Sequence, residues 1–216
     1  SFGKDGHPKP LIEELSEDLL ARFRDTPLLD GYDVYQHLMD YGAQSMQDDC
    51  YLIAADGWMV AAQPRLLLED RNRKTKARPD IVHGRKKYLT ELLPPALLIA
   101  RYFAHEQAEI DRLDAELTAL QQQIDELIEE HCGEDGLLAD ALNDKGKLTR
   151  ASAWAMLDAS LADPDSEDTE ATIALKSFLR LTQQEADTSD ELKDRRNALT
   201  EQVLAKYPTL SEAEIQ

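Results

Sequence analysis

The chain has 216 residues, a formal net charge of −19 and two cysteines. So acidic a balance excludes a protein that wraps nucleic acid over its whole surface, and two cysteines are too few for a disulfide framework. Every apolar run, 96–100 among them, is too short to cross a bilayer, and no signal peptide opens the sequence. We therefore expect a cytoplasmic protein without a membrane partner, in which Cys50 and Cys132 are thiols.

Residues 1–93 predict a small mixed α/β domain. Residues 1–10, with two glycines and two prolines, have the character of an extended linker cut from a longer protein. Apolar side chains at helical spacing predict a helix over 11–23 and a second from Tyr32 to about Met46. The second helix is rich in tyrosine, and aromatic residues at this spacing are more typical of a core than of a binding face.

The pattern changes at Cys50. The apolar run 51–55, closed by the turn signal Asp56-Gly57, predicts a β-hairpin or a buried strand. Residues 66–68 fit a strand or a helix equally well.

Basic residues are concentrated in one segment of this acidic chain. Residues 71–87 carry eight bases and one acid, whereas 94–216 carry 27 acids and 11 bases. The segment has no helical period, so we expect an exposed loop that contacts nucleic-acid phosphates; the alternatives are a loop that offsets the acidic surface or docks onto an acidic partner. We call its eight bases the basic cluster: Arg71, Arg73, Lys74, Lys76, Arg78, Arg85, Lys86 and Lys87.

Residues 94–216 predict an antiparallel coiled-coil hairpin. Pro94-Pro95 starts a helix, and 96–131 contains no Gly or Pro, so one arm of 36 residues is expected to run unbroken for roughly 54 Å. A second arm is expected over 169–207. Each arm has apolar residues at near-heptad spacing, and we expect these to pack together. The seam consists of Phe103, Ile110, Leu113, Leu117, Leu120, Ile124 and Leu127 on the first arm and Phe178, Leu181, Leu192, Leu199 and Val203 on the second.

Two further expectations concern the hairpin. Folding about a midpoint near Arg150 brings Glu106 and Glu109 level with Arg195 and Arg196, so ion pairs are predicted there. The inserted segment 132–168 is expected to form a small helical cap with Trp154 as its core. At the chain end, Ser211 and Glu214 have the spacing of a capping box and predict the start of another helix, cut short by truncation.

Sequence patterns of catalysis are nearly absent. His105-Glu106 begins like a zinc-protease helix, but Glu109 stands where a second histidine is needed. His131-Cys132 places two ligand types on adjacent residues, which point apart on a helix. The turn 143–146 and the acidic segment 163–168 lack the alternating oxygen ligands of a calcium loop. We expect no catalytic, cofactor-binding or metal residues in this chain; a metal hydrolase built on His105 is the weakest alternative.

Four segments resemble the C-terminal region of the modification subunit of bacterial type I restriction-modification enzymes. They are LLDGYDVYQHLMDY at 28–41, MQDDCYLI at 46–53, PPALLIARYF at 94–103 and LAKYP at 204–208. The similarity follows the same order along nearly the whole chain. None of the four segments is a catalytic motif.

The resemblance implies a part of an adenine-N6 DNA methyltransferase. The full subunit uses S-adenosylmethionine and assembles with a DNA-reading specificity subunit and a restriction subunit. Its chemistry lies in an upstream domain with a Gly-rich cofactor motif and an Asn-Pro-Pro-aromatic motif that holds the flipped base. This chain has no such Gly-rich motif. It also lacks the Asn-Pro-Pro motif, because its only Pro-Pro follows Leu93 and not an asparagine.

The sequence thus predicts a mainly α fold of the α+β type and a non-catalytic segment. Its expected role is to dock the methyltransferase onto the specificity subunit through helix packing and to help enclose DNA with the basic cluster. The alternative is a free-standing coiled-coil adaptor that dimerises through the seam at 103–127 and never contacts DNA.

Overall fold

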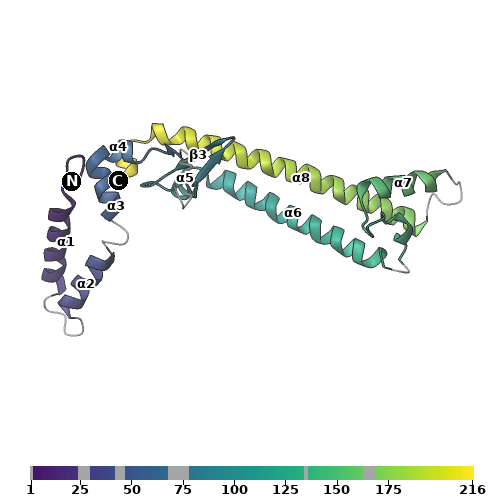
Figure 1. The fold of residues 1–216 in the computed structure, drawn as a ribbon, viewed down its shortest axis with the longest axis horizontal. Helices are drawn as coiled ribbons and strands as arrows, with labels where there is room; N and C mark the ends of the chain where they lie inside the picture. The colour runs from purple at the N-terminus through teal and green to yellow at the C-terminus, as the bar shows by residue number, and fades with distance from the viewer. Residues whose placement is uncertain (1, 24–29, 42–46, 68–77, 134–135, 163–168) are drawn as a thin grey trace. The chain divides into compact units, whose positions relative to one another are not determined.

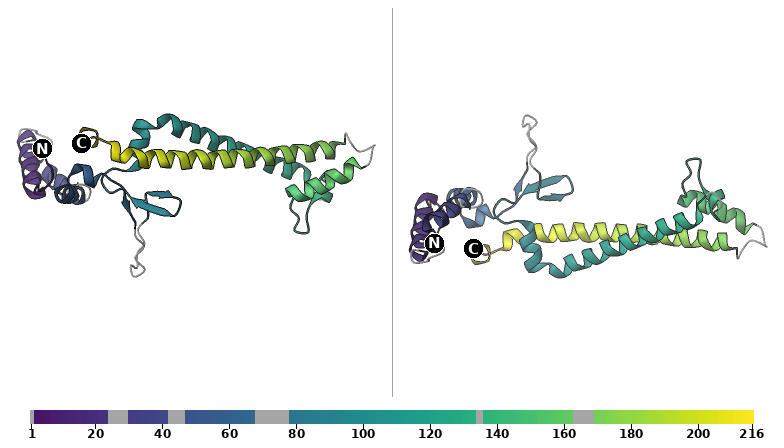
Figure 2. Two further views of the ribbon diagram at one scale, coloured as in Figure 1. Left: turned by 90° about the horizontal axis from the view of Figure 1, so that it is seen from above. Right: turned by 90° about the horizontal axis from the view of Figure 1, so that it is seen from below.

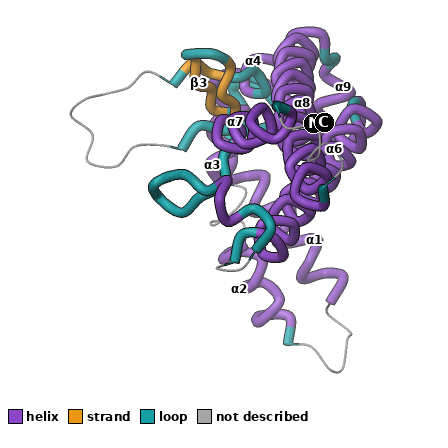
Figure 3. Tube along the Cα trace, turned by 90° about the vertical axis from the view of Figure 1, so that its right-hand side faces the viewer, coloured by secondary structure: helices purple, strands orange, loops and turns teal. Residues whose placement is uncertain are grey.

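The computed structural model describes residues 2–23, 30–41, 47–67, 78–133, 136–162 and 169–216. Within them the fold is mainly helical, with one small antiparallel sheet, as predicted (Figure 3). The chain divides into two compact units: 1–103 together with 200–216, and 104–199. The structure therefore places 94–103 and 200–216 with the first unit, a different division from the predicted one after residue 93. None of the described helices combines the length and apolarity needed to span a membrane.

The first unit contains most of the elements. Its helices and strands are α1 (Pro8–Phe23), α2 (Gly31–Tyr41), α3 (Gln47–Asp56), α4 (Trp58–Ala61), β1 (Arg65–Leu66), β2 (Ile81–His83), β3 (Lys86–Leu89), α5 (Pro95–Tyr102) and α9 (Glu212–Ile215). The strand order is β1-β3-β2, with every pair antiparallel. The last residues of the long helix α8 (Glu170–Lys206) and the 3-10 turn Tyr207–Thr209 complete this unit.

The predicted strand at 51–55 is wrong, because these residues form α3. Cys50 and Ile53 are buried one helical turn apart while Tyr51 between them is exposed, which is a helical and not an alternating pattern. Gly57 has a φ of 77° and separates α3 from α4. The turn signal at Asp56-Gly57 thus ends a helix, a position where glycine is favoured because it lacks a Cβ.

The predicted unbroken arm at 96–131 is also wrong. Helix α5 ends at Tyr102, Phe103 has the non-helical angles φ −131° and ψ 28°, and α6 begins at Ala104. The residues before the break make tertiary contacts: Leu98 is buried, and the Tyr102 hydroxyl donates a hydrogen bond to Glu214 Oε1 at 2.7 Å. These contacts hold α5 in the first unit, whereas α6 belongs to the second.

The second unit is built on two antiparallel helices. Helix α6 (Ala104–His131) and the part of α8 up to Leu199 lie side by side in Figures 1 and 2. Side chains join them at two levels: Gln121 donates to Glu185 at 3.2 Å, and Arg196 pairs with Asp114 at 3.0 Å. The predicted hairpin is therefore intramolecular in this structure.

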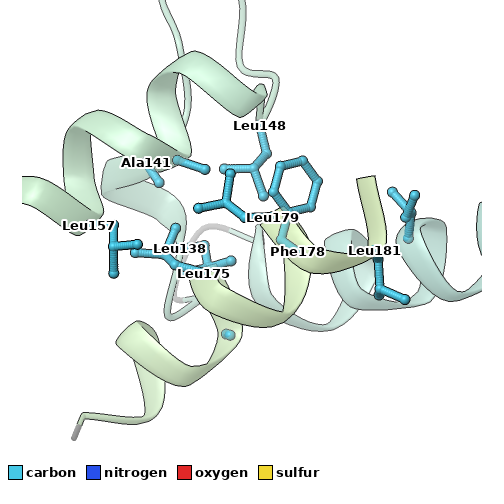
Figure 4. Close-up of a cluster of buried hydrophobic side chains, with 11 residues drawn as sticks. Leu138, Ala141, Leu148, Leu157, Leu175, Phe178, Leu179 and Leu181 are labelled. Atoms are coloured by element: carbon cyan, nitrogen blue, oxygen red, sulfur yellow. The ribbon is translucent and has the colours of Figure 1, made fainter. Parts of the chain in front are cut away.

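A small cap connects the two long helices. It contains a 3-10 turn at Ala139–Ala141, a tight turn closed by pairing of Leu142 with Leu148, and α7 (Arg150–Leu161). Thr149 and Ser152 form a capping box that starts α7. Figure 4 shows the cap's apolar side chains against α8. The buried cluster comprises Ile124, Leu138, Ala141, Leu148, Ala153, Leu157, Ala174, Leu175, Phe178, Leu179 and Leu181.

Trp154 is not the core of this cap. Its side chain is 51% exposed, whereas Ala153 is fully buried and Leu157 nearly so. Residues 153 and 157 are four apart and share one face of α7, and both belong to the buried cluster. Trp154 is one residue further along, about 100° around the helix, and so faces outward.

Candidate functional site

The structure describes only half of the basic cluster, and this half lies on or near a β-hairpin. Arg71, Arg73, Lys74 and Lys76 fall outside the described residues. Strands β2 and β3 are joined by the two-residue loop Gly84-Arg85, and the exposed side chains of Arg85 and Lys86 lie at its tip. The predicted loop, 71–87, is therefore wrong for 81–87, because these residues belong to a hairpin that spans 81–89.

Local interactions explain why this hairpin forms. Gly84 has a φ of 59°, which the first residue of a type II′ turn requires and which a side chain would disfavour. Asp80 accepts hydrogen bonds from the backbone N–H and the hydroxyl of Thr90, at 2.7 and 3.2 Å, and closes the other end. His83 Nε2 lies 3.0 Å from Glu201 Oε1. The hairpin presents two exposed cations at a turn, a geometry suited to phosphate contacts.

The other two described members of the cluster lie further from the tip. Arg78 is exposed just before β2, and Lys87 is half-buried opposite Val82. The four described bases are thus not one continuous surface at the turn. Asp80 and Glu201 add negative charge beside them.

Most of the predicted seam residues are brought together in the second unit. Ile110, Leu113 and Ile124 are buried on α6, and Leu117, Leu120 and Leu127 are half-buried. On α8 the buried members are Phe178, Leu181, Leu192 and Leu199. Phe103 and Val203 belong to the first unit instead, so neither is part of this hairpin.

The predicted ion pairs at the seam are wrong in register. Arg196 contacts Asp114, while Arg195 pairs with Glu191 on its own helix and Glu109 with Arg112 on its own helix. Asp114, the partner of Arg196, lies further along α6 than Glu106 or Glu109.

Two of the α2 tyrosines that are predicted to lie in a core are exposed. Tyr32 and Tyr41 are 73% and 63% exposed, and Tyr35 is half-buried with its ring centroid 6.2 Å from that of Tyr32. The prediction that these aromatic residues form a core is therefore wrong for Tyr32 and Tyr41. Periodicity reports which residues share a face, but burial depends on what packs against that face.

The candidate metal ligands lie apart in the structure. His105 is exposed near the start of α6, and Cys132 packs against the buried cap cluster. Burial raises the pKa of the Cys132 thiol, and burial together with the neighbouring Asp49 raises that of Cys50. In the part of the chain that the structure describes, no three His, Cys, Asp or Glu side chains are grouped to hold a metal ion.

An open groove on the second unit was not predicted from the sequence. It lies between the C-terminal end of α6 and the N-terminal end of α8, and its lining includes Leu127, His131, Leu137 and Ile173. Leu137 and Ile173 are 42% and 56% exposed. The sequence signal that could have revealed it was Ile173, an apolar residue at a helix position outside the seam.

The geometry defines a mainly helical protein with a paired-helix unit and a small sheet-containing unit. No family model matches the chain, and neither the curated proteins nor the solved structures include a match.

Proposed function

We propose that this chain is a non-catalytic C-terminal segment of the adenine-N6 DNA methyltransferase subunit of a type I restriction-modification enzyme. In this proposal the second unit docks the methyltransferase onto the specificity subunit, and the hairpin of β2 and β3 contacts DNA phosphates. S-adenosylmethionine binding and methyl transfer belong to the upstream domain of the full subunit, and the restriction subunit joins the same complex.

The observation that carries the docking role is the pairing of α6 with α8. Because the seam residues Ile110, Leu113 and Ile124 are buried and Arg196 on α8 pairs with Asp114 on α6, the two helices form a preorganised element. A preorganised helical surface loses little conformational entropy on binding, which favours stable association with another helical protein. The adaptor alternative would require α6 and α8 to separate, because its dimer uses the same seam.

Calorimetry of the chain with the purified specificity subunit tests the docking role. At two salt concentrations we expect binding that depends only weakly on salt, because an apolar helical surface makes the contact. The mass of the free chain by sedimentation is the accompanying control, and a monomer is expected. Absence of binding, or a seam-mediated dimer, would contradict the proposal.

The DNA role has its own test in the assembled complex. Replacing Arg78, Arg85 and Lys86 with Glu should weaken DNA binding and reduce the salt slope of the logarithmic binding constant by about 0.9 for each phosphate that is no longer neutralised. Lys145→Glu with Lys147→Glu, in the exposed turn of the cap, is the matched control and should leave the slope unchanged. An unchanged slope in the hairpin variant would exclude this role.

A further inference from the structure

The outer side of the cap exposes the single tryptophan of the second unit. Trp154 is 51% exposed, and its neighbours on the outer side of α7, Ala151 and Ala155, are exposed alanines. Such small neighbours leave much of the indole uncovered by α7 itself. Tryptophan is among the residues most enriched at the energetic centres of protein interfaces, because it buries a large area with few rotatable bonds. The surroundings of Trp154 therefore decide what it can bind.

Helix α7 packs antiparallel on the first turns of α8. At the start of α7, the Arg150 guanidinium donates a hydrogen bond to Gln183 Oε1. Further along α7, Leu157 lies with Leu175 at one end of the buried cluster in Figure 4. The later residue of α7 is thus close to the earlier residue of α8, so the two helices run in opposite directions.

Two basic side chains of α8 come level with Trp154. Trp154 is four residues after Arg150, so it lies one turn further along the same side of α7. In an antiparallel pair this position is level with the turn of α8 that precedes Gln183. Lys176 and Arg180 are exposed in that part of α8. Steps of four and three residues place Lys176, Arg180 and Gln183 on one side of the helix.

This part of the second unit is positive, although the unit as a whole is strongly acidic. Residues 104–199 carry 24 acidic and nine basic residues, whereas 141–157 carry one acidic and three basic residues. With Lys176 and Arg180, five of the nine bases lie in the cap or in the turns of α8 that pack against it. A nucleic acid, as a long polyanion, would extend from this small area over acidic surface, which disfavours it. A short acidic segment fits within the positive area.

We infer that the surface around Trp154 binds an acidic peptide segment of a partner protein. An apolar side chain of the segment packs on the indole, and its carboxylates pair with Arg150, Lys176 and Arg180. The hydrogen bond to Gln183 already orients the Arg150 guanidinium, so little conformational entropy is lost when a carboxylate binds. Asp158 is exposed one turn after Trp154 and repels carboxylates, which directs the acidic side of the segment toward α8. The inference adds a binding surface on α7 and does not depend on the proposed function.

Selection from a random peptide library displayed on phage tests this inference, with the full chain as the target. The recovered peptides are expected to combine Asp or Glu with Leu, Phe or Trp. Calorimetry with one such synthetic peptide then measures the contribution of each group. Trp154→Ala should weaken binding about tenfold or more. Lys176→Ala with Arg180→Ala should also weaken binding, with a larger effect at low salt than at high salt.

Two matched variants are the controls. Tyr32→Ala removes another exposed aromatic side chain, in the first unit, and Lys193→Ala with Arg195→Ala removes two exposed bases of α8 beyond the cap. Both should bind the peptide within about twofold of the parent chain. Circular dichroism of each variant verifies that the helices are retained.

Three results would overturn the inference. The first is that no peptide is recovered, or that the recovered peptides are basic or uncharged. The second is that acidic peptides bind Trp154→Ala as tightly as the parent chain. The third concerns the other class of polyanion: if single-stranded oligo-dT binds the parent chain with a steep salt dependence and Trp154→Ala abolishes that binding, the surface stacks nucleic-acid bases instead.

Discussion

At the scale of single residues, Tyr207 holds the C-terminal end of α8 in place within the first unit. Its side chain is fully buried, its hydroxyl donates to the carbonyl of Leu93 at 2.8 Å, and Gln63 donates to its backbone carbonyl at 3.2 Å. Burial raises the pKa of Tyr207 to about 12. Buried tyrosine hydroxyls require such a partner, because an unsatisfied polar group is costly in a core.

Tyr207→Phe should lower the free energy of unfolding by about 1 kcal/mol, because the carbonyl of Leu93 loses its hydrogen-bond donor while the packing is retained. Urea unfolding followed by circular dichroism measures the change. Tyr32→Phe removes a hydroxyl from a side chain that is 73% exposed and should have little effect. Equal effects of the two substitutions would show that the buried hydrogen bond contributes nothing.

Glu214 makes the contacts of α9 dependent on pH. The hydrogen bonds from Tyr102 and Ser211 lower the pKa of its carboxyl from 4.5 to about 2, and Lys206 lies 3.8 Å away. A carboxyl whose pKa is lower in the folded state stabilises that state above the unfolded pKa. This contribution is therefore complete above about pH 4.5 and is lost as the pH falls toward 2.

Comparing the parent chain with Glu214→Gln tests this dependence. The difference in unfolding midpoint should be constant from pH 7 to about 5 and should shrink below the ordinary pKa of a glutamate. Glu212→Gln removes an exposed carboxylate from the same helix and serves as the control. A difference that grows on acidification would contradict the assignment of the ionised form to the folded state.

At the scale of elements, the cap is held by small and branched apolar residues and not by its tryptophan. Leu175→Ala should destabilise the second unit by about 2–5 kcal/mol, because it leaves a cavity beneath α7. Trp154→Ala should cost under about 1 kcal/mol, because that side chain is 51% exposed. Thermal unfolding of the full chain measures both changes in stability. A larger loss of stability for Trp154→Ala than for Leu175→Ala would show that Trp154 belongs to the core of the cap.

At the scale of the whole molecule, excess negative charge opposes folding. Like charges crowded on one compact unit repel, and salt screens them: the Debye length falls from about 30 Å at 0.01 M to about 8 Å at 0.15 M. The melting temperature should therefore rise over this range. Asp125→Lys with Glu129→Lys should show a smaller rise, because repulsion along α6 is already reduced. A melting temperature that falls with salt would show that attractive ion pairs dominate.

The sequence by itself determined the features whose causes are local. The apolar spacing and the lack of Gly and Pro over 169–207 predicted α8, which runs over 170–206, and Pro95 marked the start of α5. The capping box of Ser211 and Glu214 is also present, with the Glu214 carboxylate accepting from the Ser211 backbone at 2.8 Å. The prediction of a mainly α fold with a small sheet is confirmed. Fold class could be predicted because it depends on many local signals of this kind.

Only the tertiary structure decided the features that depend on residues far apart in the sequence. The break at Phe103 has no Gly or Pro beside it that could have predicted it, and it directly follows Tyr102, which contacts Glu214, 112 residues away. The pairing of Arg196 with Asp114, the outward position of Trp154 and the exposure of Ile173 depend on which faces meet. Periodicity defines the apolar faces of a helix, whereas the packing of other elements decides which of those faces is buried.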